Sequence, residues 1–344
     1  MKISSARSPL RLGFAGGGTD VPPYTDLYGG CVVNATIDKY SYARVKQVNS
    51  DLINFSSIDQ EVEFSFSDSE SRKRPFRLHP ALTLHDQSFR YFREKYLDES
   101  ISSIAIETYS EAPKGSGLGG SSSIVVAILK SLSDYFEVTL PVDDLAHDAV
   151  IIEREYCGFA GGRQDHYSSA YGGVNFMTFG KNYSTSVESL KPSKSFLLEI
   201  ESSIVLVDTG ISRFSSDIIS DQSIGIKDKI KEIEDSLHGI KNEAINMKNA
   251  IVTESTISFI ETMERGRKFK NSSSKLVETS QIQEFYNTAL NHGAITGKIS
   301  GAGGGGFLIL IVDLKNRAKL VQSLQAMGGK VSNCHFTFEG VESW

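Results

Sequence analysis

The chain has 344 residues, of which 40% are hydrophobic and 23% are charged, and its formal net charge is −6. This length is sufficient for two domains with substantial hydrophobic cores. The acidic balance argues against a nucleic-acid or anionic-membrane surface, and no run of 18 apolar residues predicts a membrane-spanning helix.

The three cysteines, Cys31, Cys157 and Cys334, are far apart in the chain. Their spacing fits neither a metal site nor a disulfide framework, and we interpret Cys31 and Cys157 as small buried apolar side chains. The first residues lack the apolar segment of a signal peptide. We therefore expect a cytoplasmic protein in a reducing compartment.

The first half of the chain mixes predicted strands and helices. The period-two alternation of EVEFSFSD is typical of a half-buried strand, and early acidic residues with a final glycine are typical of a helix. The expected strands are 31–38, 40–48, 61–68, 103–110 and 171–180, and the expected helices are 88–97, 123–136 and 142–158.

The chain becomes polar near 190–200, and we place a domain boundary there, which gives domains 1–195 and 196–344. Helix–strand alternation in both halves predicts a two-domain α+β protein. In the second half we expect a strand at 203–210, amphipathic helices at about 215–265 and at 279–292, a glycine loop opening into a strand within 297–312, and an edge strand at 331–340.

The stretch PKGSGLGGSSS (113–123) joins a predicted strand to a predicted helix. Its glycines match the dinucleotide pattern G-x-G-x-x-G, but the acidic residues that follow, Asp134 and Glu137, end the same helix instead of the next strand. No Gly-Lys-Ser/Thr is present, which excludes a Walker A loop. The remaining possibilities are a structural loop and a phosphate cradle, since a helix N-terminus offers free N–H groups and the serines offer hydroxyls near a Mg²⁺ position.

Two further glycine-rich stretches each fit a tight turn when taken alone. In RSPLRLGFAGGGTD (7–20), Arg7 and Arg11 precede the glycines, and Thr19 and Asp20 follow them. A cation and a carboxylate that bracket a loop in this way could bind opposite ends of a polar ligand. The third stretch, ISGAGGGGFLIL, is functional only if a ligand or another backbone approaches it closely.

Together the three stretches resemble the motifs of the GHMP kinase superfamily, which includes galactokinase, homoserine kinase, mevalonate kinase and phosphomevalonate kinase. Pro9, Arg11 and Asp20 reproduce the first motif, residues 113–121 match the second, and residues 300–306 match the third, in the same order along the chain. The resemblance implies an N-terminal domain like ribosomal protein S5 domain 2, a ferredoxin-like C-terminal domain, an active site between them, and the cofactors ATP and Mg²⁺.

The resemblance also implies roles for individual residues. Asp165 is the expected catalytic base, because sugar kinases of the superfamily place theirs in a Gly-x-Gln-Asp setting; a helix N-cap is the structural alternative. Arg11 would lower the pKa of that carboxyl and stabilise the transferred group. Ser121 and Glu153 would bind Mg²⁺, with Glu155 as the alternative to Glu153. The expected ATP-binding residues are Pro113, Gly115, Ser116, Gly117, Leu118, Gly119, Gly120, Ser121 and Ser122.

Within the superfamily, residues 7–24 and 161–177 look most like the bacterial D-glycero-D-manno-heptose 7-phosphate kinases, with bacterial sugar and fucose kinases as neighbours. The galactokinase branch has Glu-His where this chain has Gly17 and Gly18, so the pocket should be open at the far end of the sugar. A second phosphate would need basic contacts. The expected substrate contacts are Gly17, Gly18, Thr19, Asp20, Arg163, Arg213, Lys298, Gly301, Gly303 and Gly304, while His166 fits either a substrate contact or a hydrogen-bonding wall.

The expected reaction is ATP-dependent phosphorylation of the anomeric hydroxyl of D-glycero-D-manno-heptose 7-phosphate to the 1,7-bisphosphate, which by family analogy serves nucleotide-activated heptose synthesis. The alternatives are an anomeric kinase for an unphosphorylated sugar such as L-fucose, a non-catalytic ATP- and sugar-binding regulator, and a dinucleotide-dependent oxidoreductase. We expect a small-molecule partner and neither a nucleic acid nor a membrane. The basic groups SRKRPFR and ERGRKFK are interpreted as solvated surface charge.

Overall fold

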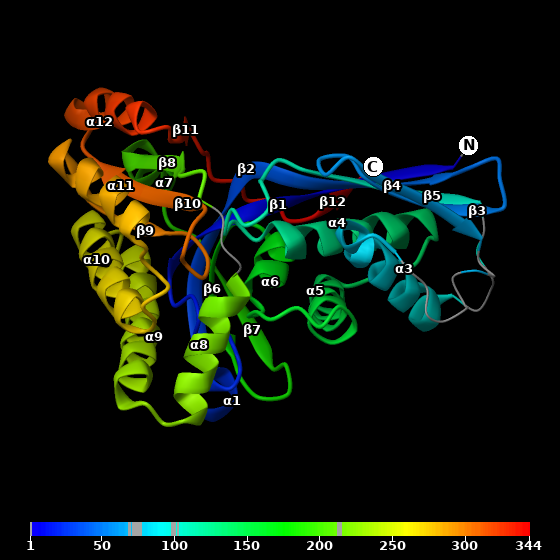
Figure 1. The fold of residues 1–344 in the computed structure, drawn as a ribbon, viewed down its shortest axis with the longest axis horizontal. Helices are drawn as coiled ribbons and strands as arrows, with labels where there is room; N and C mark the ends of the chain where they lie inside the picture. Colours follow the sequence, from blue (N-terminus) through cyan, green and yellow to red (C-terminus); the bar gives the residue numbers. More distant parts are fainter. Residues whose placement is uncertain (1, 68–69, 71–77, 98–100, 102, 212–214) are drawn as a thin grey trace.

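The computed structural model describes residues 2–67, 70, 78–97, 101, 103–211 and 215–344. In these ranges the chain forms two β-sheets that lie one after the other along the long axis of the molecule, each packed against helices (Figure 1). Among the described helices, none is both long and apolar enough to cross a membrane.

The first sheet has the strand order β12-β1-β2-β5-β3-β4, and β6 and β7 extend it from β2. Only the β3–β5 pair is parallel among the described strands. Strand β2 pairs with β1 along one side, and with β6 and then β5 along the other. The strands are β1 (Ile3–Ala15), β2 (Gly30–Gln47), β3 (Leu52–Ser57), β4 (Val62–Ser67), β5 (Ile104–Ser110), β6 (Val174–Phe179), β7 (Thr185–Leu190) and β12 (Glu342–Ser343).

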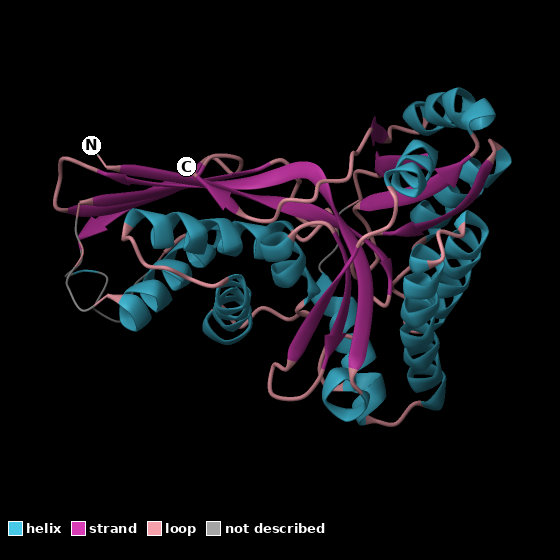
Figure 2. Cartoon of the chain, turned by 180° about the vertical axis from the view of Figure 1, so that it is seen from behind, coloured by secondary structure: helices cyan, strands magenta, loops and turns pink. Residues whose placement is uncertain are grey.

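Helices of the first half cover one face of this sheet (Figures 1 and 2), while α9 (Lys231–Val252) and α10 (Thr256–Ser272) of the second half pack on the other face of β1 and β2. One apolar core lies between the sheet and the helices of the first half, where Phe55 of the sheet, Phe92 and Val125 are fully buried. The helical segments of this half are α1 (Tyr24–Tyr28), η1 (Pro80–Leu82), α3 (Thr83–Tyr96), α4 (Gly120–Tyr135), α5 (Val142–Ile151), the π-helical η2 (Ile152–Tyr156) and α6 (Gln164–Tyr171).

The second sheet is antiparallel with the order β11-β8-β10-β9. Its two faces belong to different cores: one packs on α11 and α12, and the other faces α7, α9, α10 and the first sheet. The elements are α7 (Lys194–Ser203), β8 (Ile204–Asp208), α8 (Ser215–Lys227), α9 (Lys231–Val252), α10 (Thr256–Ser272), α11 (Ser280–Asn291), β9 (Ala294–Ile299), β10 (Phe307–Val312), α12 (Leu314–Ala326) and β11 (Lys330–Ser332).

Several predicted bounds are wrong for identifiable reasons. The two strands expected at 31–38 and 40–48 are one strand, β2, because the register shift against β1 between Pro9 and Leu10 accommodates a bulge without ending the strand. The helix expected at 142–158 changes to a π-turn after Ile151. The edge strand expected at 331–340 ends at Ser332, because the chain then returns to the first sheet as β12.

The α+β architecture with two sheets is confirmed. The predicted division at 195/196 stays a prediction; residue 195 lies in α7, just before the first strand of the second sheet. The return of β12 means that both ends of the chain belong to the first sheet, where β1 and β12 pair (Figure 1).

Candidate active site

The three glycine-rich loops of the sequence meet at one place, between the two sheets. Arg11 N donates a hydrogen bond to Leu118 O at 3.1 Å, and Phe307 N donates one to Ser116 O at 3.0 Å. Ser300 Oγ donates a hydrogen bond to Gly117 O at 2.8 Å. The second loop therefore lies between the first and the third and is bonded to both.

Glycine at position 117 is required by this contact. Its φ is +74°, and a Cβ there would meet Ser300 O at 2.4 Å. Helix α4 then begins at Gly120, and its N-cap, Gly119, is left-handed and supplies no side-chain hydrogen bond to the first turn. The N–H groups of that turn are thus available for an anion such as a phosphate.

Asp165 lies beside this helix terminus. A Cβ on Gly119 would be 3.2 Å from the Asp165 carboxyl carbon. Arg11 Nε donates to Asp165 Oδ1 at 2.7 Å, and Arg11 Nη2 lies 2.6 Å from the same oxygen. The Arg11 side chain is 4% exposed, whereas that of Asp165 is 23% exposed. A buried arginine therefore holds a carboxylate that remains partly exposed to solvent.

Arg11 also joins the carboxylate to the other two loops. Its Nη1 donates to Gly117 O at 2.6 Å and lies 3.4 Å from Ser300 Oγ. The guanidinium of this first-motif residue thus contacts the other two motifs and Asp165, and a lysine could not reproduce these several planar donor contacts. The structure brings together Arg11, Asp165 and the predicted ATP loop as expected from the sequence.

Asp20 positions the helix that carries Asp165. Its Oδ2 accepts hydrogen bonds from Arg163 N at 2.9 Å and from Gln164 N at 3.1 Å, at the start of α6. A Cβ on Gly162 would overlap that carboxylate at 1.9 Å, so only glycine permits the approach. A helix N-cap was the structural alternative to a catalytic role for Asp165. The structure gives the capping of α6 to the Asp20 carboxylate instead.

Glu153 lies in the π-turn and faces the start of α4. Ser121 Oγ donates to its Oε1 at 2.7 Å and Ser122 Oγ to its Oε2 at 2.6 Å. His166 Nε2 is 2.6 Å from Oε2, so this histidine is a wall of the Glu153 site, without hydrogen-bond geometry at that nitrogen. Glu155, the alternative, is exposed.

Glu153 is only 2% exposed. Burial raises the pKa of its carboxyl, but the charge of Arg154, the adjacent His166 imidazole and the hydroxyl hydrogen bond from Ser122 outweigh burial and hold that pKa well below its usual range. The group is therefore a carboxylate throughout the physiological range, as a cation ligand must be.

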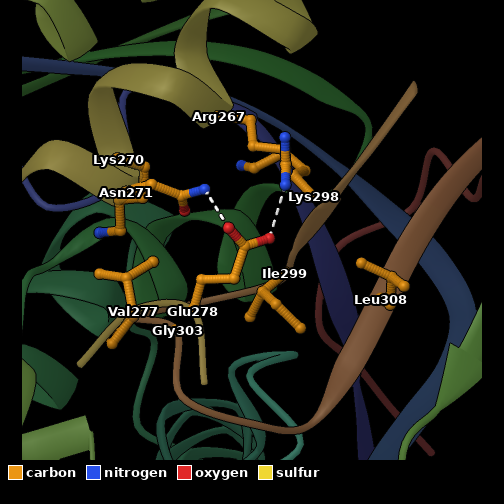
Figure 3. Close-up of a pocket in the computed structure, with 10 residues that line it drawn as sticks. Arg267, Lys270, Asn271, Val277, Glu278, Lys298, Ile299, Gly303 and Leu308 are labelled. Carbon is orange, nitrogen blue, oxygen red and sulfur yellow. Dashed lines mark hydrogen bonds and ion pairs between the residues drawn. The ribbon is translucent and has the colours of Figure 1, made fainter. Parts of the chain in front are cut away.

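Two lysines of the second half reach the first glycine loop. Lys298 Nζ donates to Gly13 O at 2.7 Å, and Lys270 Nζ donates to Gly17 O at 3.0 Å. Both line a cavity together with Arg267 and Glu278, and Figure 3 shows the Glu278 carboxylate bonded there to Arg267 and Asn271. Lys298 was a predicted substrate contact, whereas Lys270 was missed.

The signal for Lys270 was present in the sequence. ERGRKFK was interpreted as solvated surface charge, but Arg267 and Lys270 are three residues apart and so share one helical face. That face of α10 is turned toward the site, and Lys268, on another face, is exposed. Helical spacing alone does not indicate which face is buried.

Other predicted substrate contacts have protein partners. Arg163 donates to Gly180 O at 2.8 Å and holds the β6–β7 hairpin, and Thr19 Oγ1 donates to Gly16 O at 2.8 Å and Cys31 O at 2.9 Å. Both side chains position neighbouring segments, as Asp20 does, and their contact with a substrate stays a prediction.

The predicted contacts in the third motif also pack against protein. A Cβ on Gly301 would meet Gly117 Cα at 2.8 Å, and one on Gly303 would meet Val277 at 2.9 Å. Gly304 N donates to Val277 O at 2.7 Å. These glycines therefore allow the loops to approach one another, and their contact with a substrate stays a prediction. Arg213 lies outside the described residues.

Comparison with known proteins agrees with this geometry. The GHMP kinases N-terminal domain model matches residues 84–173, and the GHMP kinases C-terminal model matches residues 258–330. The D-glycero-alpha-D-manno-heptose 7-phosphate kinase of Campylobacter jejuni is 35% identical over 344 residues, which cover 100% of this chain and 99% of that protein.

Two crystal structures are also similar over nearly their whole length. A D-glycero-D-manno-heptose 1-phosphate kinase from Bacteroides thetaiotaomicron has a TM-score of 0.81 at 30% identity, covering 99% of this chain and 98% of the other. A putative sugar kinase from Campylobacter jejuni has a TM-score of 0.80 at 32% identity, covering 100% and 98%. Together with the three joined motifs and the Arg11–Asp165 pair, these similarities show that the chain belongs to the GHMP kinase family and is a sugar kinase.

Proposed function

We propose that the protein transfers the γ-phosphoryl group of ATP to the anomeric hydroxyl of D-glycero-D-manno-heptose 7-phosphate and so forms the 1,7-bisphosphate. The observation that carries this proposal is the 35% identity, over the full chain, to a heptose 7-phosphate kinase. The two named relatives differ in which phosphate their names state, but both names describe a heptose that carries phosphate.

In the proposed reaction the anomeric oxygen attacks the γ-phosphorus as the bond to the β–γ bridging oxygen breaks and ADP leaves. Asp165 accepts the proton of the attacking hydroxyl, and Arg11, bonded to that carboxylate at 2.7 Å, stabilises charge on the group in transfer. The N–H groups at the start of α4 and the loop 113–120 bind the triphosphate. An anomeric hydroxyl is more acidic than an ordinary alcohol, which suits a carboxylate base.

Ser121 and Glu153 have the chemistry for Mg²⁺, which takes one or two protein oxygens and completes its shell with phosphate and water. Their side chains are 2.7 Å apart at the terminus of α4. Within the described ranges no group of three His, Cys, Asp or Glu offers another metal site. Mg²⁺ held there would neutralise charge on the β- and γ-phosphates.

We also infer a cytoplasmic location, where ATP is supplied. In support, Cys31 and Cys334 are buried, Cys157 is half-buried, and all three are free thiols. A reducing compartment maintains this state.

The test is ATP- and Mg²⁺-dependent turnover of D-manno-heptose 7-phosphate, L-fucose, galactose and mannose by the full chain. We expect turnover of the heptose phosphate and a loss of roughly 10²–10⁴-fold in Asp165→Asn, the range for a general base. Asp134→Asn, at the exposed far end of α4, is the matched control and should retain activity. Turnover of only an unphosphorylated sugar would overturn the substrate but keep the kinase. Bound ATP without turnover of any acceptor would favour the regulator.

A further inference from the structure

Lys270 and Lys298 are two half-buried cations that the proposed reaction does not use. Each donates a hydrogen bond to a backbone carbonyl, and in the described part of the chain neither forms an ion pair with a carboxylate. Glu278 lines the same cavity, but its carboxylate pairs with Arg267 at 2.6 Å, so the two ammonium groups have no carboxylate partner and repel each other. Such an arrangement is costly unless an anion binds there.

The pKa values follow the same pattern. Burial, with the charges of Lys270 and Arg11, lowers the pKa of Lys298 to about 7. Burial also lowers the pKa of Lys270 to about 8, although the charge of Asp20 opposes this. The pKa values of both lysines therefore lie close to neutral pH. A bound dianion would raise these pKa values and keep both lysines protonated.

Every other charged group facing these lysines is already occupied. Arg11 pairs with Asp165, and Arg267 Nη2 pairs with Glu278 Oε1 at 2.6 Å. Asp20, the one carboxylate that influences Lys270, accepts hydrogen bonds from three backbone N–H groups. The positive charge left without compensation is that of the two lysines.

The lysines contact the segment that the sequence prediction assigns to the acceptor. The carbonyls to which they donate, those of Gly13 and Gly17, belong to the stretch between Arg11 and Asp20, whereas the proposed ATP loop is bonded to the Arg11 side chain through Gly117 O. Gly18 leaves space beside Lys270: a Cβ there would be 3.0 Å from Lys270 Nζ and 3.6 Å from Gln222 Oε1.

We propose that Lys270, supported by Lys298, binds the phosphate of the acceptor that is not transferred, and that Lys270 determines the preference for a phosphorylated sugar. This inference rests on the proposed function, and it names the residue that distinguishes the heptose phosphate from the unphosphorylated sugar.

The test compares kcat/KM for D-manno-heptose 7-phosphate and for D-manno-heptose in wild type, Lys270→Met and Lys270→Arg. In Lys270→Met we expect a fall of roughly 10- to 100-fold for the phosphorylated acceptor, the value of a hydrogen bond to a charged group, and little change for the other. Lys270→Arg keeps the charge and should retain most of the preference. Lys268→Met, on the exposed side of the same helix, is the control that should match wild type.

A pH profile supplies a second readout. The ratio of the two kcat/KM values should fall as pH rises through about 8, because Lys270 loses its charge there. A change in the chemical step itself affects both acceptors and cancels in the ratio. The fall should be absent in Lys270→Met.

The outcomes separate the two proposals. Wild-type turnover of the heptose phosphate with an equal loss on both acceptors in Lys270→Met would overturn this inference alone, and would assign the lysine to ATP or to the transferred group. If Lys270→Met lost no activity on either acceptor, this inference would also be overturned. Wild-type enzyme that uses the unphosphorylated sugar and not the heptose phosphate would overturn the proposed function as well. If Lys270→Met fails to fold, Lys270→Arg and the pH profile of wild type decide.

Discussion

Glu153 shows how a single residue can combine burial with a retained charge. Its carboxylate is 2% exposed and bonded to two serines of α4, and its pKa is held low by nearby positive charge. The same oxygens that bond the serines are the proposed Mg²⁺ ligand. Substitution at this residue should therefore affect the metal requirement before it affects binding of the sugar.

In Glu153→Gln we expect the Mg²⁺ concentration for half-maximal activity to rise by at least roughly 10-fold, the loss typical of even an outer-shell partner. The measurement is a Mg²⁺ titration of turnover at fixed ATP. Glu155→Gln, two residues away and exposed, should behave as wild type. A similar shift in both variants would contradict the assignment of Glu153.

Burial of Lys298 should lower the free energy of unfolding as pH falls below the ordinary lysine pKa. Its pKa is about 7 in the folded chain, against the ordinary value of 10.5, so the folded state disfavours the proton. The free energy of unfolding should rise with pH between about 7 and 10.5, and the destabilisation is complete below that window. Lys298→Met should have a higher Tm than wild type at pH 6 and a smaller advantage at pH 9. Thermal unfolding at both pH values checks this, with Lys268→Met as the unshifted control; a lower Tm at pH 6 would refute it.

At the scale of elements, the site depends on loops that approach too closely for any side chain. Gly117 faces Ser300 O, and Gly306 likewise faces Ser116 O, where a Cβ would be at 2.4 Å in each case. These contacts join the second and third motifs, so a change at one loop should displace the other. Their role is separable from backbone strain, because other left-handed glycines have open space.

Gly117→Ala should lower both Tm and kcat, whereas Gly328→Ala should lower Tm slightly. Both positions have positive φ, +74° and +87°, and share a strain of about 1–2 kcal/mol for a residue with a side chain. Only position 117 adds an overlap with backbone, since nothing lies within 4 Å of a Cβ at 328. Thermal unfolding and turnover of the pair measure the difference. Equal losses would show that loop contact contributes nothing beyond strain.

At the scale of the whole molecule, the two halves share a core. Leu12 and Phe14 of β1 belong to the same buried cluster as Phe259 of α10 and Ile309 of β10. The last ten residues return to the first sheet, where Ser5 and Trp344 exchange backbone hydrogen bonds at 2.9 Å. The active site, which lies between the sheets, thus has both halves packed around it.

Removal of residues 335–344 should lower Tm and activity. It deletes the Trp344 and Thr337 backbone pairing to the first sheet, and it uncovers Gly172 at the end of α6, the helix that carries Asp165. Thermal unfolding and turnover are the measurements. Trp344→Ala is the control, because its side chain is 63% exposed while the backbone pairing remains. A truncated chain with wild-type Tm would contradict this role.

The sequence by itself determined the family and the α+β class. Three glycine-rich motifs in a fixed order carry the family resemblance, since a phosphate cradle needs glycines and a helix terminus in sequence order. That resemblance implied Arg11 beside Asp165 and Ser121 with Glu153, with Glu155 as the alternative that the structure leaves exposed. Tertiary structure alone decided that Asp20 caps α6, that Arg163 bonds a hairpin, that the C-terminal strand returns to β1, and that Lys270 reaches the first glycine loop. Each of these depends on the packing of segments distant in sequence, and local pattern does not report which helical face becomes buried or which backbone group a charged side chain meets.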